Sequence, residues 1–244
     1  MTDTVIFLDS KKGKGKSSNF TIKLNPPVIL NPNKDYMVAL VNSELWYSWY
    51  NVTTSNNNFK YFNGTDWVTV KVPPGAYNIK DINEEIKNQI NDEGDNDEFV
   101  TLTANFNTSK TILRVNDNYK VDFDIDDGLR DLLGYDGKTL SAGRHIGDKQ
   151  INITNIHTVL IKCSLVSSSY LNGSTSDVIF NFSPNLPPGS LLSVQPNQLL
   201  YIPISRTEQI SSITMKVTNQ DDEEIEFNGE RTTFFIAIKD GGTL

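Results

Sequence analysis

Apolar and polar residues alternate in short segments along most of this chain, and a period of two limits such a chain to a mainly β fold. Turn signals such as Pro26-Pro27, Asn63-Gly64 and Pro187-Pro188-Gly189 separate the segments. About eight segments lie outside residues 75–150, with long connections and little helix. This pattern predicts a single jelly-roll β-sandwich, although the sequence does not order its strands.

The period changes after residue 75, which predicts a small α+β insertion. Ile79, Ile82, Ile86 and Ile90 form an apolar stripe at helical spacing, and Asn78 is suited to cap the helix. A second, short helix is expected to stop at Gly134. We therefore expect an inserted subdomain over residues 75–150, between jelly-roll parts 1–74 and 151–244.

The segment Tyr36–Val52 combines an apolar run with large rings. Trp46, Trp49 and Tyr50 follow the run closely, and Trp67 is the third tryptophan. Such rings either plug the end of a sandwich or form a protein–protein contact. Because the segment lies just before the expected insertion, we favour a seal between sandwich and insertion, with the protein contact as the alternative.

Composition excludes several classes of protein. A net charge of −8 argues against coating nucleic acid over a broad face. The sequence contains no run of 18 apolar residues, so no membrane span is predicted. The N-terminal segment lacks the features of a signal peptide, and Cys163 is the single cysteine, so we expect a protein that is not secreted.

Four lysines, Lys11, Lys12, Lys14 and Lys16, lie in a Gly-interrupted segment. The segment is not a P-loop, because Ser10 replaces the required first glycine and a strand-like pattern follows where a helix is needed. A solvated loop is one interpretation. The other is a contact with nucleic acid at the inner face of an assembly, or with an acidic partner.

No catalytic, cofactor-binding or metal-binding residue is predicted, and we do not expect an enzyme. Cys163 and His157 lie six residues apart on one expected strand, about 20 Å apart at 3.3 Å per residue, too far for a nucleophile and its base. Cys163 is instead expected in the core. The carboxylates of Asp122–Asp126 lack the pattern of an EF-hand, which leaves weak calcium binding as a minor alternative.

Several short phrases occur in an order that is similar to one protein family. They are Phe7-Leu-Asp-Ser10, Tyr36-Met-Val-Ala-Leu40, Trp49-Tyr-Asn51, Pro73-Pro-Gly-Ala-Tyr77, Leu132-Leu-Gly-Tyr135 and Tyr201-Ile-Pro-Ile-Ser-Arg206. In this order the chain resembles the minor capsid, or penton, proteins of Polinton/Maverick elements, adinto-like viruses and virophages.

The resemblance implies a jelly-roll capsid subunit that forms homopentamers at icosahedral vertices. It also implies a partner, a major capsid protein with a double jelly roll, and a location in the virion after synthesis in the host cytoplasm or nucleus. The family has no catalytic residues to carry over. The alternative function is a receptor- or carbohydrate-binding jelly roll, either lectin-like or a trimeric ligand. A vertex protein could itself bind a host receptor, and a β-sandwich hydrolase is the least favoured class.

Overall fold

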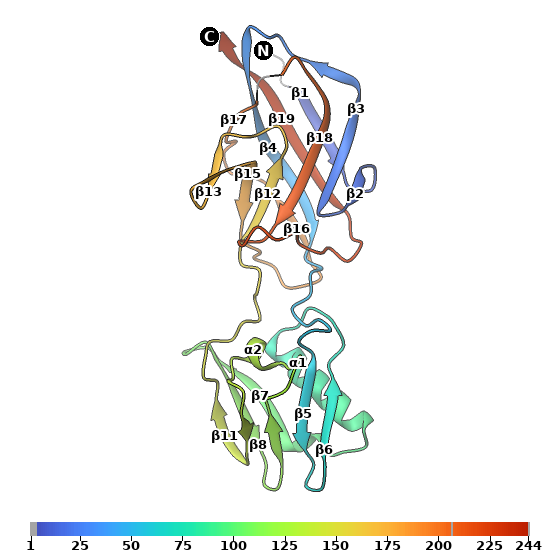
Figure 1. Ribbon diagram of the computed structural model, residues 1–244, viewed down its shortest axis with the longest axis vertical. Helices are drawn as coiled ribbons and strands as arrows, with labels where there is room; N and C mark the ends of the chain where they lie inside the picture. The colour runs from blue at the N-terminus through green and yellow to red at the C-terminus, as the bar shows by residue number, and fades with distance from the viewer. Residues whose placement is uncertain (1–3, 206, 244) are drawn as a thin grey trace. The chain divides into compact units, whose positions relative to one another are not determined.

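The computed structural model describes residues 4–205 and 207–243. Contacts divide the described chain into two compact units: unit 1, from residues 1–49 and 156–244, and unit 2, from residues 50–155. Antiparallel sheets dominate each unit, so the fold is mainly β as the sequence predicts. Figure 1 shows the strands of each unit.

Unit 1 contains two antiparallel sheets of five strands each. In the first sheet, the order is β1 (Thr4–Asp9), β19 (Thr232–Thr243), β4 (Lys34–Trp46), β16 (Leu191–Val194), with β17 (Ile202–Pro203) also on β4. In the second, the order is β15 (Val178–Phe182), β12 (Val159–Cys163), β18 (Gln209–Thr218), β3 (Asn19–Ile29), β2 (Lys14–Lys16). A separate hairpin joins β13 (Ser169–Leu171) to β14 (Ser174–Ser176).

One hydrophobic core lies between these two sheets. Leu40 and Phe234 from the first sheet and Phe20 and Ile213 from the second belong to the same buried cluster. Alternate residues along a strand point to opposite faces, so each strand contributes every second side chain to this core. Unit 1 is therefore a β-sandwich.

The pair Pro26-Pro27 lies inside β3 rather than ending it. Its partner strand β18 changes register between Ile210 and Ser212, and the two prolines fall within that irregularity. Proline has no N–H to donate to a ladder, so it is tolerated where the pairing is interrupted. The turn signal in the sequence marks an irregular stretch of a long strand.

Unit 2 has two smaller sheets and a helix. The first sheet runs β10 (Thr139–Leu140), β9 (Lys120–Asp122), β5 (Asn58–Phe62), β6 (Trp67–Lys71), and the second runs β11 (Gly143–Ile146), β8 (Lys110–Val115), β7 (Val100–Asn105). The helical elements are α1 (Ile79–Asp92), the 3-10 turn η1 (Asp97–Phe99) and α2 (Arg130–Leu133). The helix α1 packs against β7 and β6. No described helix is long and apolar enough to cross a membrane.

The predicted cap and stripe of α1 are confirmed. The Asn78 side chain accepts hydrogen bonds from the backbone N–H of Lys80 and of Asp81, at 2.8 and 3.1 Å, and Asp81 accepts in return from the Asn78 N–H. This capping box stabilises the first turn by about 1 kcal/mol. The four isoleucines of the stripe are all buried in the core of unit 2. Gly134 ends α2 in the left-handed conformation, as expected.

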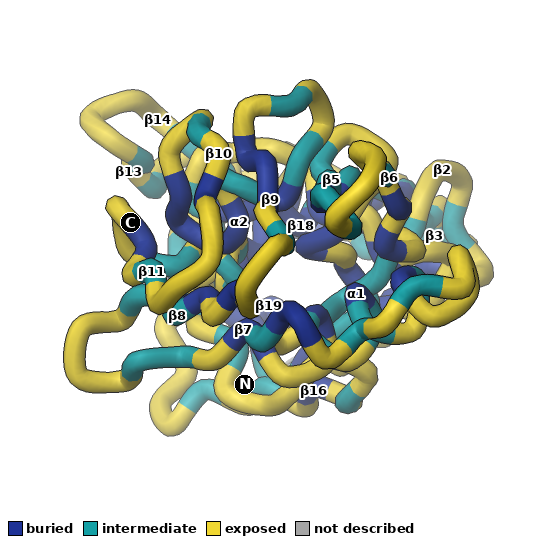
Figure 2. Tube along the Cα trace, turned by 90° about the horizontal axis from the view of Figure 1, so that it is seen from below, coloured by how far each residue is buried: buried dark blue, intermediate teal, exposed yellow. Residues whose placement is uncertain are grey.

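The compact unit starts earlier than the expected insertion over residues 75–150. The hairpin β5–β6 pairs with β9, and its inward residues Phe59, Tyr61 and Val70 join the core of unit 2. Residues 50–74 therefore belong to unit 2, and the prediction that they are part of the sandwich is wrong. The hairpin signal was local, whereas the β5–β9 pairing that places it joins segments about 60 residues apart. Figure 2 shows buried residues along the strands and helix, and exposed residues along most connections.

Candidate interaction surfaces

The four lysines of the Gly-interrupted segment are all exposed, but they are not on an unstructured loop. Lys14 and Lys16 lie in β2, which pairs with the start of β3. Gly15 permits this tight hairpin, because its φ is +132° and a side chain there would meet the Asn19 carbonyl oxygen at 2.2 Å. The segment therefore presents its lysines from a fixed edge of the second sheet.

Carboxylates of the same chain lie beside these lysines. Lys16 Nζ lies 3.9 Å from Glu226 Oε2, and Lys11 Nζ donates a 2.7 Å hydrogen bond to the Gly229 carbonyl. Glu224 accepts from the Asn19 side chain at 2.8 Å. These carboxylates reduce the local positive potential, so a nucleic-acid contact would depend mainly on Lys12 and Lys14. That contact stays a prediction.

Trp49 is a core residue of unit 1. It is 3% exposed, its ring stacks on Tyr47 with centroids 4.1 Å apart, and Phe227 meets it edge-on at 6.0 Å. Trp46 and Tyr50 keep about two fifths of their surface exposed. Burial of Trp49 agrees with a plug within the sandwich, while its role as a seal against the insertion stays a prediction.

An apolar patch lies on the outward face of β1 and β19. Phe7 and Phe235 are paired across these strands with ring centroids 4.7 Å apart, and Phe7 is 51% exposed. Val5 lies two residues earlier on the same face of β1 and is also exposed. Because β1 is the last strand of its sheet in the described chain, its outer backbone edge has no strand partner.

Trp67 stands on the outward face of the first sheet of unit 2. It faces Phe62 on β5, with ring centroids 5.5 Å apart, and the Lys60 ammonium lies 5.0 Å from the centre of the indole. Lys120 on β9 is paired with Phe62 in register, and its ammonium lies 5.6 Å from the phenyl ring. We call Trp67, Phe62, Lys60 and Lys120 the aromatic–lysine face.

Asp122 lies on the same face and is fully engaged. Its carboxylate accepts hydrogen bonds from the Lys60 ammonium at 3.0 Å, the Asp124 N–H at 3.1 Å and the Thr139 hydroxyl at 3.3 Å. Burial acts to raise the pKa of the Asp122 carboxyl, but these donors outweigh it and hold the pKa below its usual value. The negative charge of Asp122 is therefore balanced within the protein.

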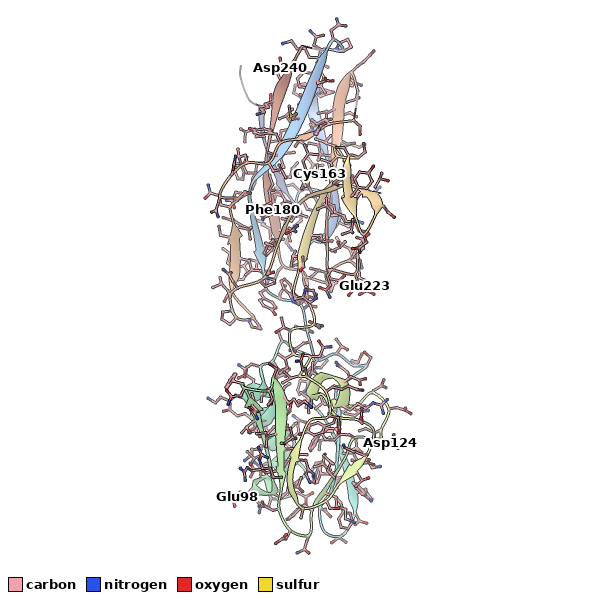
Figure 3. All side chains as sticks on the ribbon, turned by 90° about the vertical axis from the view of Figure 1, so that its left-hand side faces the viewer. Glu98, Asp124, Cys163, Phe180, Glu223 and Asp240 are labelled. Atoms are coloured by element: carbon pink, nitrogen blue, oxygen red, sulfur yellow. The ribbon has the colours of Figure 1, made fainter. Side chains whose placement is uncertain are left out.

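The residues weighed for catalysis do not come together as a site. Cys163 is buried inside unit 1, where burial raises the pKa of its thiol to about 12, and His157 is exposed before β12 begins. Figure 3 labels Cys163 on its strand and Asp124 in unit 2. Among the described residues, no group of three His, Cys, Asp or Glu side chains could hold a metal ion.

A groove of about 720 Å³ lies along α1 and β7 in unit 2. Ile79, Ala104, Ile151 and Ile153 contribute apolar side chains to its walls, and Phe106, 91% exposed, lies at the end of β7. The groove is suited to an apolar side chain or ligand.

Trp67 was a candidate from the sequence, whereas its neighbours on this face were not. Lys60 and Phe62 lie two residues apart on β5 and therefore on one face. Their position beside the Asn63-Gly64 turn was a detectable signal. Lys120 carried no signal, because it reaches this face only through the pairing of β5 with β9. Phe7 and Phe235 were likewise hidden, since they come from the two ends of the chain.

Comparisons with known proteins give matches among solved structures alone. No family model matches the sequence, and no curated protein matches it. Among solved structures, the fold is similar to the selenomethionine-labelled mavirus penton protein, with a TM-score of 0.49 and 11% sequence identity over 97% of this chain and 100% of that chain. This similarity is too low to assign a family or an activity.

Proposed function

We propose that this chain is a penton-like minor capsid protein, a single jelly-roll subunit that forms a homopentamer at capsid vertices. The observation that carries the proposal is the strand order of unit 1. Its eight principal strands in chain order are β1, β3, β4, β12, β15, β16, β18 and β19. With these counted from one to eight, the sheets run 1-8-3-6 and 2-7-4-5.

That order is the one expected for a jelly roll. Six of the seven connections change sheets, and only the step from β12 to β15 joins neighbours in the same sheet. Two interlocked Greek keys produce this pattern, and viral capsid subunits and lectins share it. Unit 2 is inserted between the third and fourth principal strands, so it interrupts a connection and leaves every strand intact.

The apolar patch on β1 and β19 favours a capsid subunit over a monomeric binding protein. Phe7, Phe235 and Val5 expose apolar surface beside a strand edge without lysine or proline. Soluble monomers usually protect such an edge with charge, proline or a covering segment. A neighbouring copy that covers this patch would form a heterologous contact, and repeated heterologous contacts close into a ring.

The remaining parts of the proposal follow from the sequence resemblance. They are a double jelly-roll major capsid protein as partner, a location in the virion after synthesis in the host cell, and a host receptor. A contact with packaged nucleic acid is proposed for Lys12 and Lys14, together with Lys11 and Lys16, which have partners within the chain.

Native mass spectrometry of the purified chain tests the proposal. We expect a homopentamer. We expect Phe7→Glu to convert it to monomers, because the new charge would be buried at the subunit contact without a partner. Tyr170→Glu is the matched control, because Tyr170 is exposed on the separate β13–β14 hairpin. A stable trimer would favour the trimeric ligand, and a monomer under all conditions would contradict the ring.

A further inference from the structure

We propose that the aromatic–lysine face of unit 2 binds an acidic glycan, a sugar chain that carries carboxylate or sulfate groups. The face is defined by Trp67, Phe62, Lys60 and Lys120 on the outward side of β5, β6 and β9. The proposal does not require the chain to form a capsid ring, because all of these residues belong to unit 2.

The geometry of Trp67 provides a platform for a sugar ring. The indole is held against β5 by Phe62 at 5.5 Å and by the Lys60 ammonium at 5.0 Å, yet it remains 44% exposed. An aromatic face carries a partial negative charge, and the C–H groups on one side of a sugar are apolar and slightly positive. A ring already fixed by its neighbours loses little conformational entropy when a sugar stacks on it.

The charge of the face selects an acidic sugar over a neutral one. Asp122 is neutralised by Lys60, whereas no ion pair of Lys120 is found within the described part of the chain. Lys71 is exposed on the same side of β6, four residues from Trp67, which is about 13 Å at 3.3 Å per residue. The ammonium groups of Lys120 and Lys71 therefore lie beside the rings of this face, although the net charge of the chain is −8.

A single strand of nucleic acid also combines stacking with phosphate charge, but the face fits it less well. Such strands are held by successive rings along a continuous basic groove. Here the outward row along β6 alternates one ring with Thr69 and Lys71, and no further aromatic residue follows Trp67 on that strand. One stacking position with a cation on each side is suited to one sugar ring and its acidic neighbours.

Isothermal titration calorimetry of the full chain tests this site. The probes are a heparin hexasaccharide, 3′-sialyllactose, neutral lactose and the oligonucleotide dT12. We expect the sulfated or the sialylated probe to bind, and lactose to bind at least tenfold more weakly. Which acidic probe binds better distinguishes sulfate from carboxylate recognition.

Three variants locate the binding site. Trp67→Ala should weaken binding of the acidic probe about tenfold, and Trp67→Phe should retain part of the affinity. Lys120→Gln should weaken it several-fold and reduce its salt dependence. Lys80→Gln removes the same charge from an exposed side of α1 and should change nothing. Lys120→Gln keeps the test decisive if Trp67→Ala fails to fold, because Lys120 is exposed.

Two results would overturn the proposal. One is an absence of heat from both acidic probes at millimolar concentration. The other is binding that survives both Trp67→Ala and Lys120→Gln. If dT12 binds as tightly as the hexasaccharide and responds to the same variants, the face recognises nucleic acid and the glycan assignment is wrong.

Discussion

The ammonium of Lys162 lies 2.6 Å from the Asp222 carboxylate, although Lys162 stands in the middle of a fully buried strand and its side chain is only 7% exposed. Asp177 is a second, weaker partner at 3.6 Å. A buried ammonium requires such compensation, because its desolvation costs several kcal/mol. The loop that carries Asp222 is thereby attached to β12 of the sandwich.

Asp222→Asn should lower the free energy of unfolding by about 1–2 kcal/mol at pH 7. The hydrogen bond from Lys162 holds the pKa of Asp222 below its usual value, so this stabilisation is present at pH values above about 4. It is lost as the pH falls through the depressed pKa of the folded state. The φ of Asp222 is +66°, which asparagine tolerates equally well.

Urea unfolding of both proteins across pH 2–7 measures this effect. Asp221→Asn removes the same charge from the same loop and should cost much less, because among the described residues the Asp221 carboxylate accepts a side-chain hydrogen bond from Gln220 alone. A stability difference that stays constant down to pH 2 would show that the Asp222 charge is not its source.

The Cys163 thiol should be inert in the folded protein. Burial raises its pKa to about 12, so thiolate is nearly absent at pH 8, and reagent cannot reach the sulfur. Ellman's reagent should therefore report no free thiol until urea is added, and then one per chain. Rapid reaction of the native protein would mean that β12 opens readily.

Trp49→Ala should destabilise unit 1 by about 3 kcal/mol, because it removes a buried ring that contacts Tyr47 and Phe227. Trp46→Ala is the matched control. Its ring is 38% exposed, and we expect a loss below about 1 kcal/mol. Thermal melting of the protein, measured together with native mass spectrometry, distinguishes a plug of the sandwich from a protein–protein contact. If Trp49→Ala abolishes the proposed pentamer but leaves the melting temperature unchanged, the protein-contact interpretation is favoured.

Asn51→Ala should destabilise unit 2 by about 2–3 kcal/mol. The Asn51 side chain accepts from the Tyr77 N–H at 2.9 Å and donates to the carbonyls of Tyr77 and Ile153, at 2.7 and 3.0 Å. Its removal leaves three partly buried backbone groups without these partners. Hydrogen exchange of residues 50–155 should accelerate in Asn51→Ala and not in Asn88→Ala, where the side chain is exposed on α1. Equal protection in both variants would contradict a structural role of Asn51.

Local patterns in the sequence predicted the elements whose stabilising contacts are also local. The 3-4-4 spacing from Ile79 to Ile90 and the Asn78 cap define α1 within one segment, and the structure confirms both. Two strands were missed or shortened for physical reasons. The lysine-rich segment of β2 has no apolar period. The largely apolar segment 199–204 forms only the two-residue strand β17, and Ile204 makes a separate bridge to Val166.

Features created by distant pairing could not be predicted. Nothing in the sequence marks Lys162 as a buried lysine, but all five residues of β12 are buried, so both faces of this strand are covered. Its compensation comes from residues 15 and 60 positions later in the chain. The aromatic–lysine face and the Phe7–Phe235 pair likewise depend on the register of strands that are far apart in the sequence.

The Asn51 amide joins the first residues of unit 2 to its last, so this unit closes on itself where the chain arrives and departs. A domain whose ends lie close together can be removed, lengthened or replaced by another fold, because the domain that carries the insertion keeps the sequence of its own strands. Recombination at residues 50 and 155 would thus replace unit 2, for which we propose glycan binding, and leave the strands of unit 1 unchanged. The same junction offers a grafting point for a foreign domain.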